Sequence, residues 1–187
     1  MKANSLRRLI YAALFLAIAL TLPFLTGQIP EIGKMLCPMH LPVLATGFLL
    51  GMPYGAVVGF VAPLLRCLLF STPVFTTALP MAFELLAYGL LAGLFCRLLP
   101  KRLPFYYLAL LLSLLGGRIT LAVAQLLMYG IRGESFVFTA YFSANVTRAL
   151  PGIALQFLLL PPLVHLLSQK KGLRAGREKK EKGNENV

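Results

Sequence analysis

The sequence contains no aspartate, no tryptophan and few charged residues for its length of 187. Charged residues make up 13% of it, whereas a soluble domain carries roughly a quarter. Without aspartate, aspartyl proteases, DxxD-type metal sites and a Walker B motif are excluded. The patterns GxxxxGK[ST], GxSxG and HExxH are missing as well, so the chain cannot power transport by itself. We therefore expect no enzyme, no catalytic residue and no cofactor.

Long apolar runs recur along the whole chain. Hydrophobic residues account for 58% of it, and the mean hydropathy is +0.80. The first run resembles a secretory signal, but no small-x-small cleavage pattern follows Leu22 and five more apolar segments come after it. The pattern predicts an all-α membrane protein with six transmembrane helices, over residues 6–25, 39–50, 56–70, 76–98, 104–129 and 143–167.

The basic residues are distributed unevenly. With six spans, thirteen of the eighteen Lys and Arg residues fall at the start of the first span, around the turn between the fourth and fifth, or after the last. This distribution places both termini in the cytoplasm, in a cell membrane, and it argues against a nucleic-acid partner for a chain of formal charge +12. We expect one transmembrane domain, residues 1–168, followed by a basic disordered tail, residues 169–187.

Glycine and proline residues lie between and within the second and third predicted spans. Residues 51–55 read Gly-Met-Pro-Tyr-Gly, which predicts a tight turn and leaves both spans too short to cross ~30 Å of hydrocarbon without tilt or shielding. Short, interrupted spans are common in transporters, where irregular backbone lines a cavity. Four glycines at intervals of four residues predict close packing between adjacent spans: Gly47, Gly51, Gly55 and Gly59.

Four charged residues lie in the interior of the predicted spans, more than three residues from either end: Arg66, Glu84, Arg118 and Arg148. Hydrocarbon tolerates such groups only when they face a partner, a ligand or a water-filled cavity. One glutamate cannot neutralise three arginines, so a surplus of positive charge remains. Guanidinium groups suit capture of a carboxylate or phosphate. The sequence therefore predicts an anion-binding site.

The predicted depths place these charges in the outer half of the bundle. We expect Glu84 to pair with Arg66 or Arg148, Arg118 to form the floor of the pocket, and Arg66 to lie at its rim. Asn145 and Gln125 lie on similar faces to Arg148 and Arg118, and His40 starts the second span. Neither His40 nor the three cysteines show metal-ligand spacing, so we expect no metal. The predicted substrate-binding residues are Arg118, Arg148, Glu84, Asn145, Arg66, Gln125 and His40.

Two stretches resemble the substrate-binding S components of energy-coupling factor (ECF) vitamin transporters. Residues 13–17, Ala-Leu-Phe-Leu-Ala, are similar to the family's AxxxA surface. Residues 39–43, Met-His-Leu-Pro-Val, with the glycines and arginine that follow, resemble a subgroup of that family. The resemblance implies a six-helix S-component bundle that binds a vitamin from outside beneath a lid, residues 26–38. It also implies partners: a transmembrane coupling subunit, docked on Ala13 and Ala17, and two ATPase subunits.

The expected substrate is an anionic vitamin or precursor such as pantothenate, nicotinate or a folate. Two other classes stay open at this point. A stand-alone secondary transporter would need proton or sodium coupling, and Glu84 is the only acidic residue in a span. A structural membrane protein without a small ligand would need Ala13 and Ala17 but not the arginines.

Overall fold

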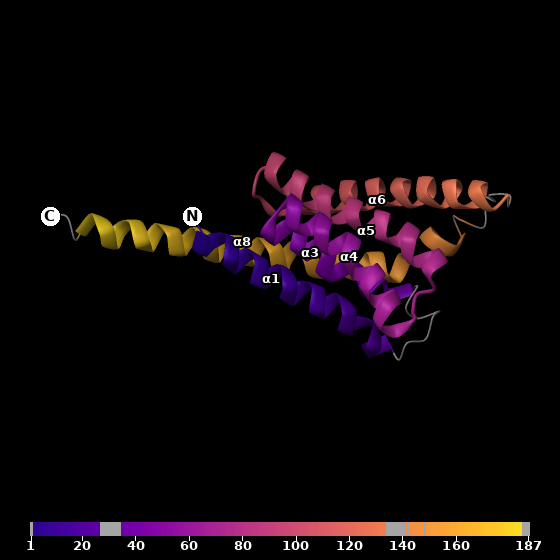
Figure 1. The fold of residues 1–187 in the computed structure, drawn as a ribbon. Coiled ribbons are helices and arrows are strands. Elements are labelled where there is room, and N and C mark those ends of the chain that lie inside the picture. The colour runs from indigo at the N-terminus through magenta and orange to yellow at the C-terminus, as the bar shows by residue number, and fades with distance from the viewer. Residues whose placement is uncertain (1, 27–34, 134–140, 142, 148, 185–187) are drawn as a thin grey trace.

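A computed structural model describes residues 2–26, 35–133, 141, 143–147 and 149–184 of the chain. Six α-helices, with two short irregular helices between them, make up this part (Figure 1). In chain order they are α1 (Lys2–Thr21), the 3-10 helix η1 (Leu22–Thr26), α3 (His40–Leu50), α4 (Met52–Phe70), α5 (Phe75–Leu98), α6 (Leu103–Arg132), the π-helix η2 (Ser143–Thr147) and α8 (Leu150–Asn184).

The helices form one bundle, with α5 packed against α3, α4 and α6. Helix α1 lies against α3 and α4, and α8 against α3 and α6. The start of α1 and the far end of α8 lie at the same end of the bundle (Figure 1). Five segments are long and apolar enough to cross a membrane, and α3 is a shorter apolar helix. The prediction of an all-α, six-helix membrane bundle is confirmed.

The third span is longer than we expected. The predicted turn over residues 51–55 is wrong, because only Gly51, with φ 100°, separates α3 from α4. Pro53 lies in the first turn of α4, where its missing N–H removes no helical hydrogen bond. Helix α4 therefore has 19 residues, enough to cross the membrane, whereas α3 with 11 residues is short as predicted.

Glycine packing joins α3 and α4 to α5. A Cβ at Gly47 or Gly55 would collide with the backbone of Gly89 on α5, and one at Gly59 would collide with the backbone of Leu85. The predicted close packing is confirmed for these three glycines. Gly51 does not take part, since a Cβ there would meet nothing within 4 Å. Helices α3 and α4 thus pack closely against α5, which carries Glu84.

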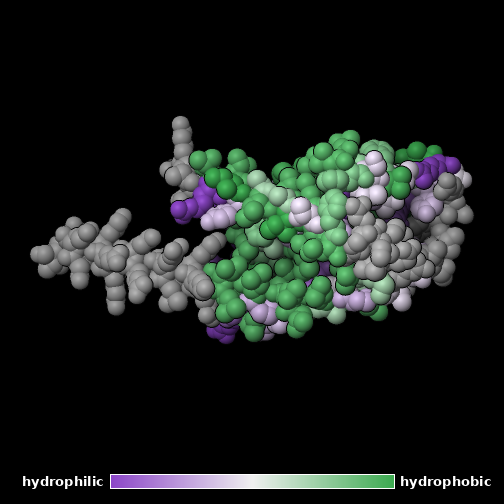
Figure 2. Space-filling model, turned by 90° about the horizontal axis from the view of Figure 1, so that it is seen from below, coloured by the Kyte–Doolittle hydropathy of each residue, from purple (hydrophilic) through white to green (hydrophobic). Residues whose placement is uncertain are grey.

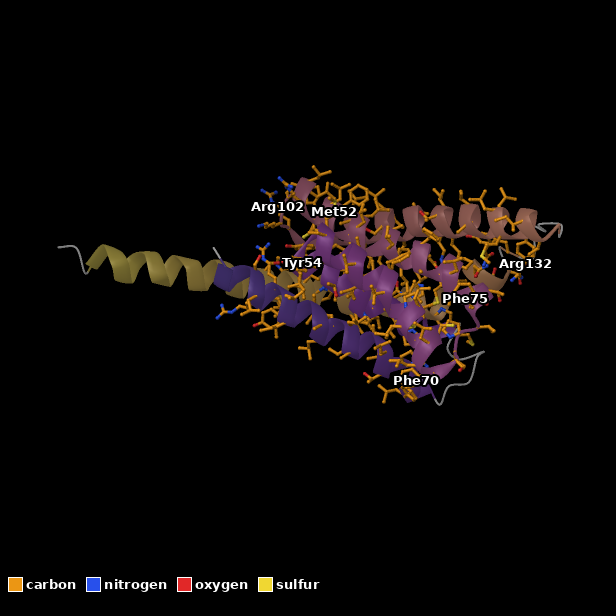
Figure 3. The ribbon with its side chains drawn as sticks, in the orientation of Figure 1. Met52, Tyr54, Phe70, Phe75, Arg102 and Arg132 are labelled. Atoms are coloured by element: carbon orange, nitrogen blue, oxygen red, sulfur yellow. The ribbon has the colours of Figure 1, made fainter. Side chains whose placement is uncertain are left out.

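The surface agrees with a membrane environment. On the face shown in Figure 2, hydrophobic residues cover the middle of the bundle and hydrophilic residues lie toward its ends. Arg102 lies at one end with Met52 and Tyr54, and Arg132 lies at the other end with Phe75 (Figure 3). Helix α8 continues to Asn184, through the stretch that we expect to be a disordered tail. The domain boundary after residue 168 stays a prediction.

Candidate functional site

The buried carboxylate of Glu84 on α5 is paired with Arg118 on α6. Arg118 Nη1 donates to Glu84 Oε1 at 2.9 Å, and the Glu84 side chain is only 4% exposed. We expected Arg66 or Arg148 to pair with Glu84, but Arg66 lies elsewhere and Arg148 lies outside the described residues. The pair neutralises the charge of Arg118 and fixes its guanidinium in one orientation.

Tyr88 adds a second donor to the same carboxylate oxygen. It lies one turn after Glu84 on α5, and its hydroxyl donates to Glu84 Oε1 at 2.8 Å. Gly117 makes room for it, since a Cβ there would collide with the Tyr88 ring. The glycine before Arg118 therefore lets α6 approach α5 closely enough for the ion pair to form.

His40, the first residue of α3, completes the contact with a third helix. Its Nε2 lies 3.8 Å from Glu84 Oε1, and its ring centroid lies 5.3 Å from that of Tyr88. The residue is 4% exposed. Side chains from α3, α5 and α6 thus meet at Glu84, and we call His40, Glu84, Tyr88 and Arg118 the polar cluster.

The chain just before α3 covers this cluster. Cys37, Pro38 and Met39 are buried, and the carbonyl groups of Met35 and Leu36 lie against Gly152 on α8. Burial raises the pKa of the Cys37 thiol to about 11, and the positive charge of Arg118 beside it lowers that pKa in part. Within the described residues, Cys37, Cys67 and Cys96 form no disulfide.

Several buried nitrogens of the cluster have no hydrogen-bond partner in the described part of the chain. They are Nδ1 and Nε2 of His40 and Nε of Arg118. An unpaired buried polar group costs about 1–3 kcal/mol, so such groups in a folded protein call for an explanation. A bound ligand that offers acceptor atoms would satisfy the Arg118 N–H and an imidazole N–H together.

Arg66 on α4 lies apart from the cluster. Its Nη1 donates to the carbonyl oxygen of Leu20 at 2.6 Å, near the end of α1. Its guanidinium carbon lies 5.0 Å and 5.5 Å from the ring centroids of Phe24 and Phe70. A cation at the C-terminal end of a helix is favoured by the helix dipole. This geometry ties α1 and η1 to α4.

The other predicted site residues are not gathered at Glu84. Gln125 lines a cavity between the start of α5 and the end of α6. Asn145 in η2 donates through Nδ2 to the carbonyl oxygen of Tyr141 at 3.1 Å, and Tyr141 donates to the backbone carbonyl of Arg118 at 2.7 Å. Within the described residues, no three His, Cys, Asp or Glu side chains could hold a metal ion.

Three residues of the site were not predicted: Tyr88, Cys37 and Tyr141. Tyr88 had a usable signal, because it follows Glu84 by four residues on one helix and so shares its face. Cys37 precedes His40 by three residues but lies in a loop with φ 47°, where helical spacing gives no guidance. Tyr141 acts through backbone contacts, which side-chain patterns do not reveal.

The chain is similar in sequence to one family over most of its length. The family described as "ECF transporter, substrate-specific component" matches residues 7–164. The chain belongs to this family. No curated protein and no solved structure matches the chain.

Membership in the ECF family gives the chain its role. ECF substrate-specific components are transport subunits rather than enzymes, and they lie in the cell membrane as multi-pass proteins. They work with energising partners and bind a substrate. The polar cluster and the segment that covers it are the candidate substrate site.

Proposed function

We propose that this ECF component binds a vitamin or vitamin precursor with a carboxylate group, and that the polar cluster holds that group. The observation that carries the proposal is the set of unpartnered buried nitrogens on His40 and Arg118. A carboxylate is acceptor-only and offers two oxygens, so one oxygen can take the Arg118 Nε–H while the other faces His40.

Glu84 positions the arginine in this proposal. By accepting from Nη1 and from Tyr88, it holds the guanidinium in the orientation that leaves Nε for the ligand. Because Glu84 already neutralises Arg118, binding depends on hydrogen bonds more than on net charge. Pantothenate, nicotinate and folates all carry the required group.

The segment before α3 acts as the end of a lid. The carbonyl groups of Met35 and Leu36 approach Gly152 on α8, where a Cβ would collide with them, and Cys37 lies beside Arg118 of the cluster. Opening this segment would let solvent and substrate reach the cluster, and closing it would exclude water, which strengthens the polar contacts.

The partners proposed for the transport step are a transmembrane coupling subunit and two ATPase subunits. Ala13 and Ala17 are both exposed on α1 and lie one turn apart on one face. Small residues let a second helix approach closely, and close packing drives helix association in lipid. ATP hydrolysis by the partners supplies the energy that this chain lacks the motifs to provide.

The proposal is tested by comparing acids with their neutral analogues. Native mass spectrometry of gently purified protein first identifies any co-purified molecule. Calorimetry then compares nicotinate with nicotinamide and pantothenate with its alcohol. We expect at least one acid to bind about tenfold or more tightly than its neutral analogue, a difference of about 1.4 kcal/mol. Equal affinity for each acid and its neutral analogue would contradict the carboxylate assignment.

A further inference from the structure

A polar cavity of about 130 Å³ lies between the start of α5 and the end of α6. Its lining includes Thr76 and Thr77 from α5 and Gln125 and Arg132 from α6. A water molecule occupies about 30 Å³, so the cavity has room for a small anionic group. Among the described residues that line it, Arg132 is the only charged one and none is acidic.

The lining offers donors suited to an anion. Arg132 is exposed, and in the described part of the chain no acidic side chain pairs with it. Helix α5 starts at this cavity, with no acidic residue in its first turn and no side-chain cap from Val74. Its N-terminus therefore adds partial positive charge and N–H groups next to the two threonine hydroxyls.

The cavity is aligned with the polar cluster. Arg118, Gln125 and Arg132 follow one another at intervals of seven residues, which keeps them on a similar face of α6. On α5, Pro80 lines the cavity and Glu84 lies one turn further in. Figure 3 shows Phe75 and Arg132 at the same end of the bundle. A solute bound in the cavity would thus lie directly outward of the Glu84–Arg118 pair.

We propose that this cavity is an outer capture subsite, where Arg132 and the start of α5 bind the anionic group of the solute before it reaches the polar cluster. The inference rests on the proposed function for the identity of the solute, and it assigns a second, weaker site on the route to the first. Arg132 contributes a charge-assisted hydrogen bond, whose loss weakens binding by about tenfold.

The chain has no tryptophan, so a tryptophan introduced at the cavity is the only source of tryptophan fluorescence in the protein. Met128 lines the cavity, and Met128→Trp places the fluorophore there. The variant is titrated with nicotinate in phosphatidylcholine nanodiscs. We expect saturable quenching by nicotinate, about tenfold weaker binding in the Arg132→Gln background, and no change with Arg97→Gln, an exposed arginine at the other end of α5.

Two further arms separate the alternatives. The double variant Glu84→Gln/Arg118→Met removes the ion pair of the polar cluster without leaving an unpaired buried charge. It leaves the quenching unchanged if the capture subsite is distinct from the polar cluster, so a failure of the proposed function does not imitate a failure of this inference. Phosphatidylglycerol in the nanodiscs competes with nicotinate only if the cavity is a lipid headgroup site.

A second measurement covers the case in which Met128→Trp does not fold. Saturation-transfer NMR with nicotinate on the protein without the tryptophan, with and without Arg132→Gln, then repeats the comparison. Unaltered binding in Arg132→Gln, equal binding of nicotinamide, or quenching by phosphatidylglycerol alone would overturn the inference.

Discussion

At the scale of single residues, the three described charges inside the spans, Arg66, Glu84 and Arg118, have different roles. Glu84 and Arg118 form an ion pair at 2.9 Å, while Arg66 donates to a helix-end carbonyl and lies near two phenylalanine rings. Replacing one member of a buried pair leaves an uncompensated charge and costs about 3–5 kcal/mol. Loss of either partner alone therefore destabilises the fold, and the pair orients the arginine.

Cys37 gives a residue-scale test of how well the segment before α3 covers the cluster. Its pKa of about 11 keeps the thiol neutral at pH 8, so maleimide should react with it about 100-fold more slowly than with an ordinary thiol. The measurement uses a variant in which Cys67 and Cys96 are alanine. The reaction rate should rise with pH up to about 11.

The matched control for Cys37 is Ser71→Cys in a background without other cysteines. Ser71 is exposed in the turn between α4 and α5 and has no comparable burial. If Cys37 reacts as fast as the control at pH 8, residues 35–38 do not cover the cluster in the way described here.

The site residues that could be predicted are those that carry a charge, because charged side chains are rare inside transmembrane segments. Glu84 and Arg118 are conspicuous because a charge in an apolar span needs a partner. Which arginine pairs with Glu84 could not be predicted, because that depends on helix rotation set by Gly117 and Tyr88 packing. Gln125 lines the cavity instead of joining the cluster because, although it shares a face of α6 with Arg118, seven residues separate the two by about 10.5 Å along the helix.

At the scale of elements, α1 differs from the helices at the centre of the bundle. In an apolar stretch of 18 residues within residues 5–25, only 17% of the residues are buried, whereas 44% are buried in the corresponding stretch of α5. Helix α1 therefore leaves a broad face for a partner or for lipid. Ala13 and Ala17 lie on that exposed face, and Ala12 and Ala19 lie on the buried one. The alternation of small residues on two faces suits a helix packed on both sides.

Replacing Ala13 and Ala17 together with leucine should block transport and leave substrate affinity near that of the native protein. The larger side chains prevent close approach of a partner helix, but neither residue lies near the polar cluster. Uptake in cells and calorimetry on purified protein measure the two quantities. Leu14→Ala, also on the exposed face, is the control and should support uptake. Loss of substrate affinity in the double variant would show that α1 shapes the site.

The elements themselves followed from the sequence, with errors at the ends. Six apolar segments predict six helices because hydrocarbon demands internal backbone hydrogen bonding. The predicted start of α4 was wrong because proline is common both in turns and in the first turn of a helix, and Pro53 lies in the first turn of α4. A single Gly51 in the left-handed region is enough to reverse the chain, and no pattern distinguishes it from its neighbours.

At the scale of the whole molecule, the polar cluster lies where three helices meet, so its chemistry and the stability of the bundle are linked. Helices α3, α4 and α5 are joined by glycine contacts, and Arg118 on α6 ties a fourth helix to them. Substrate binding at the cluster would therefore bridge α3 and α6 across α5. The central claim is that Arg118, held by Glu84, binds the substrate.

The double variant Glu84→Gln/Arg118→Met tests this claim most directly, because it separates folding from binding. Arg118→Met alone leaves Glu84 unpaired and should lower the free energy of unfolding by about 3 kcal/mol. Removing both charges should restore the thermal midpoint to near that of the native protein, since a buried ion pair replaced by neutral groups costs little. Affinity for the tightest-binding acid should still fall about tenfold or more in the restored variant. A folded double variant that binds the acid as tightly as the native protein would contradict the account.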